Sequence, residues 1–111
     1  MANTIKLLGY TYTVDLVEEA NEMRASGHLH TGKQVIRVAL DQCMEGKIST
    51  LIHEVIHAIT WHQQVEMTEE DLMRLETGFH SFLKDNNIDL TPLEKVVCGS
   101  KRRSSTGKTA K

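Results

Sequence analysis

His53-Glu54-Val55-Ile56-His57 lies within a segment whose apolar residues recur at the three- and four-residue spacing of an α-helix. On such a helix the two histidines are one turn apart and project from the same side. The aliphatic residues of the segment occupy the opposite side: Ile48, Leu51, Ile52, Val55 and Ile59. We therefore predict a helix that is capped at Ser49 or Thr50, runs to about Gln63, buries this stripe and presents both histidines to a cleft.

Two imidazoles on one side of a rigid helix can bind the same zinc ion. Glu54 flanks the two histidines and can act as a general base toward water at the metal. An ordinary amphipathic helix could carry the same five residues on its polar face by chance. The aliphatic stripe opposite the histidines favours the metal site. We predict one zinc ion per chain, with His53 and His57 as ligands and Glu54 as the catalytic residue.

A catalytic zinc ion needs a third protein ligand and one open position. If the helix continues, His62 points into the aliphatic stripe, so we expect it to be a packed or surface histidine. The next predicted helix offers three acids, Glu69, Glu70 and Glu76. Glu70 faces away from the apolar side of that helix. The rise along an antiparallel helix pair places Glu76 nearer than Glu69 to the second histidine, and both remain candidates.

The remaining elements precede and follow the histidine helix. Strand patterns come first, and helical patterns come after it. We predict strands at 4–8, 10–17, 27–30 and 34–40, either a short helix or a loop at 18–26, a second helix from Thr68 to about Asn87, and a short last helix at 93–97. Strands followed by helices predict an α+β fold. A small N-terminal sheet should pack on the histidine helix, and the second helix should close the site.

Charge divides the chain into two parts. Residues 1–98 hold all 15 acidic residues and 8 of the 13 basic ones, whereas residues 99–111 hold five basic residues and no acid. We predict one metal-binding domain over 1–98 and a disordered basic tail over 99–111, which could contact nucleic acid or an acidic surface weakly. Two cysteines form no disulfide framework, which favours the cytoplasm. No apolar run approaches the roughly 20 residues of a membrane span.

Together these segments resemble short phage and prophage proteins related to the ImmA/IrrE-type metallopeptidases. The resemblance covers most of residues 4–87, and its most specific part is the His-Glu-x-x-His helix. Weaker matches are Gly9-Tyr10-x-Tyr12-x-Val14, Gln34-x-Ile36-x-Val38, Glu69-x-x-Leu72-x-x-Leu75-x-x-Gly78-Phe79 and Phe82-Leu83-x-Asp85-Asn86. The resemblance implies a minimal zincin fold in a bacterial host cell. It also implies Glu69 as the third zinc ligand, ahead of Glu76 and Glu70.

The same resemblance implies zinc-dependent hydrolysis of a peptide bond in a host or phage protein. In such an arrangement the strand at 34–40 borders the cleft and could pair with an extended substrate. Three further histidines are candidates for stabilising the oxyanion: His28, His30 and His80. Two other functions stay open. The chain could be a non-catalytic, zinc-containing phage protein that binds a host regulator or defence factor, or a small nucleic-acid-associated factor that acts through its basic tail.

Overall fold

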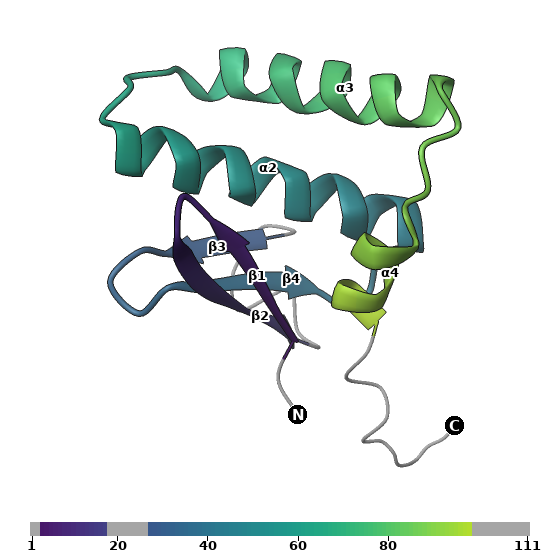
Figure 1. Cartoon of the computed structure of the whole chain (residues 1–111), viewed down its shortest axis with the longest axis horizontal. Helices are drawn as coiled ribbons and strands as arrows, with labels where there is room; N and C mark the ends of the chain where they lie inside the picture. Colours follow the sequence, from purple (N-terminus) through teal and green to yellow (C-terminus); the bar gives the residue numbers. More distant parts are fainter. Residues whose placement is uncertain (1–2, 18–26, 99–111) are drawn as a thin grey trace.

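The computed structural model describes residues 3–17 and 27–98. Within them lie four strands and three helices: β1 (Asn3–Leu7), β2 (Tyr10–Val17), β3 (Gly27–His30), β4 (Val35–Ala39), α2 (Met44–Gln63), α3 (Glu69–Asp85) and α4 (Thr91–Cys98). The strands form one mixed sheet, so the predicted α+β class is confirmed (Figure 1). The predictions for 18–26 and for the tail at 99–111 lie outside the described residues.

The sheet has the order β1-β2-β4-β3. Consecutive strands form two hairpins, because β1 pairs antiparallel with β2 and β3 pairs antiparallel with β4. The two central strands, β2 and β4, run parallel, with Thr13 opposite Val35. The β1–β2 turn places Leu8 and Gly9 at positive φ, which gives a two-residue hairpin the twist of its strands.

This order corrects the expectation that the strand at 34–40 borders the cleft with an edge free to pair. β4 is hydrogen-bonded to β2 on one side and to β3 on the other. The edge strands are therefore β1 and β3, and β3 is the one that lies on the histidine side of α2. The sequence pattern indicates a hairpin, but it does not show which of its two strands joins β2.

Helix α2 begins at Met44 and its N-cap is Cys43, six or seven residues before the predicted cap at Ser49 or Thr50; it ends at Gln63 as expected. Gly46 lies inside the first turn of this helix. A Cβ at Gly46 would lie 3.3 Å from Gln42 Cβ, so the glycine leaves room for the Gln42 side chain. The Gln42 amide donates to the Ala39 carbonyl at 3.0 Å and accepts from Thr50 Oγ1 at 3.1 Å. These bonds connect the end of β4 to the second turn of α2.

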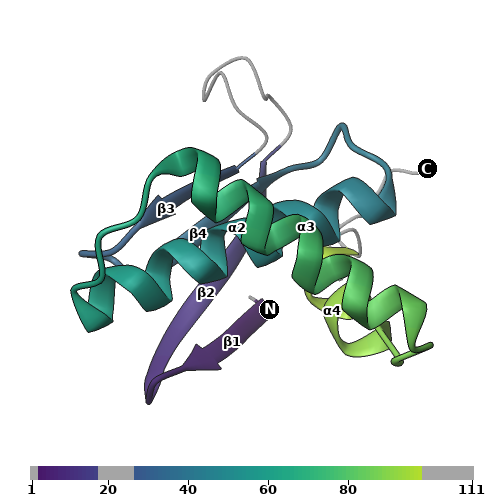
Figure 2. The same cartoon turned by 90° about the horizontal axis from the view of Figure 1, so that it is seen from above.

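The core lies between the sheet and one side of α2, which crosses a single face of the sheet (Figures 1 and 2). Its buried residues come from the sheet, α2 and α4: Leu7, Tyr12, Val14, Ile36, Val38, Ile48, Leu51, Ile52, Ala58 and Val97. Of the predicted stripe, Ile48, Leu51 and Ile52 are buried and Val55 is partly buried, but Ile59 is 38% exposed, which corrects its predicted burial. His62, predicted to be a packed or surface histidine, is partly buried at the edge of this core and is stacked on Tyr10 with ring centroids 4.1 Å apart. Its Nε2 lies 2.7 Å from the Tyr12 hydroxyl.

Helix α3 is capped by Thr68, whose side chain accepts from the Asp71 amide at 3.1 Å, as the sequence predicted. The apolar side of α3 is buried only in part. Leu72 is 1% exposed, whereas Leu75, Phe79 and Phe82 are half exposed. The burial of α3 against the rest of the protein therefore depends mainly on Leu72. None of the described helices is long and apolar enough to cross a membrane.

Leu72→Ala should destabilise the protein by about 2–4 kcal/mol, because it leaves a cavity at the one buried position of α3. Phe82→Ala is the matched control and should cost less than about 1 kcal/mol, since Phe82 is 53% exposed. Urea unfolding followed by circular dichroism measures both changes. Equal costs for the two variants would show that α3 is held by its half-exposed residues instead.

Candidate metal centre

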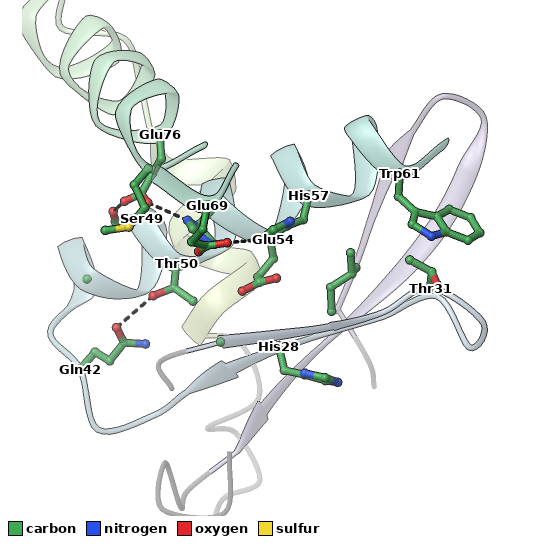
Figure 3. Close-up of a pocket in the computed structure, with 15 residues that line it drawn as sticks. His28, Thr31, Gln42, Ser49, Thr50, Glu54, His57, Trp61, Glu69 and Glu76 are labelled. Carbon is green, nitrogen blue, oxygen red and sulfur yellow. Dashed lines mark hydrogen bonds and ion pairs between the residues drawn. The ribbon is translucent and has the colours of Figure 1, made fainter. Parts of the chain in front are cut away.

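Three side chains from α2 and α3 converge on one point (Figure 3). His53 and His57 are four residues apart on α2 and project from the side opposite the core. His53 Nε2 lies 2.8 Å from Glu69 Oε2, and His57 Nε2 lies 3.1 Å from Glu69 Oε1. One ligand atom from each of the three residues lies within 4.8 Å of the others. This group could hold a metal ion.

The donor types suit a divalent cation. Imidazole nitrogen and carboxylate oxygen are common ligands of zinc and of other transition metals. In both histidines the nitrogen that lies next to the Glu69 carboxylate is Nε2. Glu69 has a side chain that is 60% exposed, so it approaches from the solvent side. Two imidazoles and one carboxylate would leave a fourth position for water or substrate.

Glu76 contacts His53 on the ring nitrogen that does not face Glu69. Its Oε1 accepts a hydrogen bond from His53 Nδ1 at 3.0 Å, and its Oε2 accepts one from the Ser49 hydroxyl. A carboxylate on Nδ1 fixes the ring orientation of His53 and leaves Nε2 as the donor toward a metal. Ser49, a predicted cap of this helix, lies inside α2 instead. There its hydroxyl donates a hydrogen bond to Glu76.

Glu69, not Glu76, contacts His57. This corrects the prediction from helix rise, which placed Glu76 nearer to His57. Glu69 contacts both His57 and His53. Glu76, about two turns further along α3, contacts His53 and Ser49. The five residues between the helices, 64–68, bring the start of α3 back along α2. Glu70 is outside the group and pairs with Arg74 at 3.0 Å.

Glu54 is buried beside the histidines, with only 7% of its surface exposed. Burial raises the pKa of Glu54 to about 7; His53 opposes this shift, and the nearby Glu69 and Glu76 add to it. A cation on the adjacent histidines would lower that pKa again. Gly27 at the start of β3 makes room for the carboxylate, since a Cβ there would lie 3.1 Å from Glu54 Oε2 and 2.4 Å from Thr50 Cγ2.

A cleft of about 850 Å³ opens in front of these residues, between β3, α2 and α3. Of the proposed oxyanion donors, only His28 lines it. The Nδ1 of His30 accepts a hydrogen bond from the Lys33 amide, and His80 lines a separate hollow beside Glu45. The structure therefore gives His30 and His80 no place at the cleft.

Sequence reasoning missed several residues of the site. Ser49, Gly27 and Trp61 all contribute to it. For Trp61 a signal was present, since it follows His57 by four residues and so shares the histidine side of the helix. For Gly27 and Ser49 no local pattern exists, because their roles depend on contacts between separate elements.

Comparisons with protein-family models, curated proteins and solved structures found no match to this chain. The chemistry of the site is therefore inferred from its own residues.

The two glutamates should differ in their effect on metal affinity. Glu69→Gln removes a carboxylate ligand and should weaken zinc binding by more than ~100-fold, whereas Glu76→Gln loses only the support of His53 and should cost roughly 10-fold. Glu70→Gln is the control and should have no effect, because Glu70 pairs only with residues of its own helix. Competition against a chromophoric chelator measures all three. A larger loss for Glu76→Gln would exchange the roles of the two glutamates.

Glu54 should also destabilise the metal-free protein at neutral pH. Its folded-state pKa, about 7, lies above its ordinary value of 4.5. The group's contribution to stability is therefore fully present below about pH 4.5 and is lost as the pH rises toward 7. In chelator-treated protein, Glu54→Gln should raise the free energy of unfolding at pH 8 by about 1–3 kcal/mol and change it less at pH 5. Urea unfolding at both pH values tests this, and a gain that is the same at both would contradict it.

Proposed function

We propose that this protein is a zinc-dependent metallopeptidase-like enzyme that hydrolyses a peptide bond. One observation carries the proposal: His53, His57 and Glu69 converge within 4.8 Å at a cleft in which Glu54 is buried beside them. Two histidines and one carboxylate form a ligand set used by catalytic zinc ions. A purely structural site would need neither a base beside its ligands nor a fourth position open to a cleft.

Zinc bound at these residues would polarise a substrate carbonyl and favour deprotonation of water. Proton transfer and the positioning of the ligands would come from the chain's own residues. Glu54 takes a proton from the attacking water and can pass it to the leaving amine. Burial on the Gly27 side directs the Glu54 carboxylate toward the cleft, and Glu76 keeps His53 in position through Nδ1.

An extended substrate would run along β3. This strand is the sheet edge next to the cleft, and Gly27, His28 and Leu29 line the cleft. An exposed edge offers backbone groups that can pair with a peptide strand. The proposal thus moves the substrate strand from β4, where the sequence reading placed it, to β3.

The resemblance to phage-encoded relatives of the ImmA/IrrE metallopeptidases supports the same proposal from the sequence. On that basis the substrate is a host or phage protein in the cytoplasm of a bacterial cell. The order of elements, with strands first, then a His-Glu-x-x-His helix, then a helix that supplies Glu69, suits the minimal zincin fold that the resemblance implies.

Hydrolysis is tested with a peptide library prepared from a bacterial proteome, in which mass spectrometry detects new chain ends. Wild-type protein should carry close to one zinc ion per chain and should generate new ends. Glu54→Gln should keep its zinc but lose at least ~100-fold in cleavage, the usual scale of general-base catalysis. His53→Ala should lose both zinc and cleavage. Cleavage by Glu54→Gln at the wild-type rate would exclude Glu54 as the base.

A second function, binding of a host regulator or defence factor without hydrolysis, is favoured by the partly exposed apolar side of α3. Leu75, Phe79 and Phe82 are each about half exposed there, and the two phenylalanine rings stack with centroids 6.5 Å apart. Exposed apolar groups of this kind are typical of protein-binding surfaces. If Glu54→Gln matches wild type in the host while Phe79→Asp does not, zinc has a structural role and binding is the function.

A further inference from the structure

Trp61 is the chain's single tryptophan, and it lies at one end of the metal cleft. It follows His53 and His57 at four-residue intervals, so all three side chains occupy one side of α2. Trp61 is 58% exposed, and its ring touches His62 edge-on at a centroid distance of 5.2 Å. A large aromatic side chain is thus held in place with most of its surface turned to the cleft and solvent.

The distance from the metal residues to Trp61 suits an extended peptide. Strand β3 and helix α2 form neighbouring walls of the cleft, with Gly27 near Glu54 and Thr31 facing Trp61 at one end (Figure 3). Trp61 lies about 6 Å along the helix axis beyond His57 and about 12 Å beyond His53. An extended chain advances about 3.3 Å per residue. A peptide paired with β3 would therefore bring the side chain two or three residues from the metal to Trp61.

Two large apolar side chains, Trp61 and Leu29, line this part of the cleft. Leu29, on β3 two residues before Thr31, is half buried and lines the same cleft. Among the described residues that line the cleft there is no lysine or arginine, whereas Glu54, Glu69 and Glu76 are all present. A substrate side chain with a negative charge would find no partner here and would meet three carboxylates.

We propose that Trp61 and Leu29 form a specificity subsite that selects an aromatic or large aliphatic side chain, and rejects an acidic one, two or three residues from the scissile bond. This inference rests on the proposed function and adds the substrate class to it. Tryptophan at the wall of such a subsite supplies a large contact area at little entropic cost.

Synthetic hydroxamates, whose head group binds zinc, test the subsite without any need for turnover. Acetohydroxamate probes the metal alone. Two series of short peptide hydroxamates extend from the head group in either chain direction and carry Phe, Gly or Asp at the second or third residue. Titration calorimetry of the zinc-loaded full chain measures affinity, and the emission of Trp61 reports contact directly.

In one chain direction, we expect the Phe compound to bind roughly tenfold more tightly than the Gly compound, and the Asp compound more weakly than either. Phe should shift the Trp61 emission to the blue, and acetohydroxamate should not. Trp61→Ala should abolish the preference for Phe without changing acetohydroxamate affinity. Phe82→Ala, which removes an exposed aromatic residue that does not line the cleft, should leave the preference intact.

Two results would overturn the subsite. One is equal affinity for Phe and Gly in both series together with an unchanged Trp61 emission, a measurement that needs no variant. The other is a preference for Phe that survives in a folded Trp61→Ala protein. If acetohydroxamate itself does not bind zinc-loaded protein, the proposed metal centre fails, and the subsite fails with it.

Discussion

Burial of the aliphatic stripe of α2 against the sheet determines where both histidines point. Ile48, Leu51 and Ile52 are at most 5% exposed and contact the central strands. Because these residues recur at helical spacing, α2 cannot rotate about its axis without exposing them to water, at roughly 1.5–3 kcal/mol for each side chain. His53 and His57 are on the opposite side of the same helix, so the free energy of core packing orients them toward the cleft.

Helix α3 is attached in a different way, and this has consequences for the site. Leu72 is its one fully buried residue among those described, while two of its glutamates contact α2 histidines. The position of α3 therefore depends on few apolar contacts and on several polar ones at the candidate metal centre. A metal ion bound by His53, His57 and Glu69 would bridge the two helices and stabilise the folded state, since the unfolded chain has no such site.

The cleft contains several features that would lower the stability of a protein if they stood in an ordinary core. Glu54 is buried with a raised pKa, and it is close to two other carboxylates. Gly27 leaves space that a side chain would fill, and Trp61 keeps more than half of its surface exposed. Buried acids with perturbed pKa values cluster at functional sites, because catalysis uses protonation states that simple burial disfavours. Here these features lie around one group of potential ligands, while the far side of α2 has an ordinary apolar core.

By itself, the sequence determined those features that depend on local periodicity and spacing. These include the positions of the four strands, the histidine side of α2, the Thr68 cap and the α+β class, because each follows from residues that are close in the chain. Only the tertiary structure decided the features that depend on how separate elements meet. The parallel contact between β2 and β4 made β3 the edge strand, and the course of residues 64–68 set the level of α3 on α2. The position of α3 along α2 brings Glu69 to the Nε2 atoms of both histidines and Glu76 to the Nδ1 of His53. No sequence motif predicts these contacts, because a contact between two helices depends on the path of the loop that joins them.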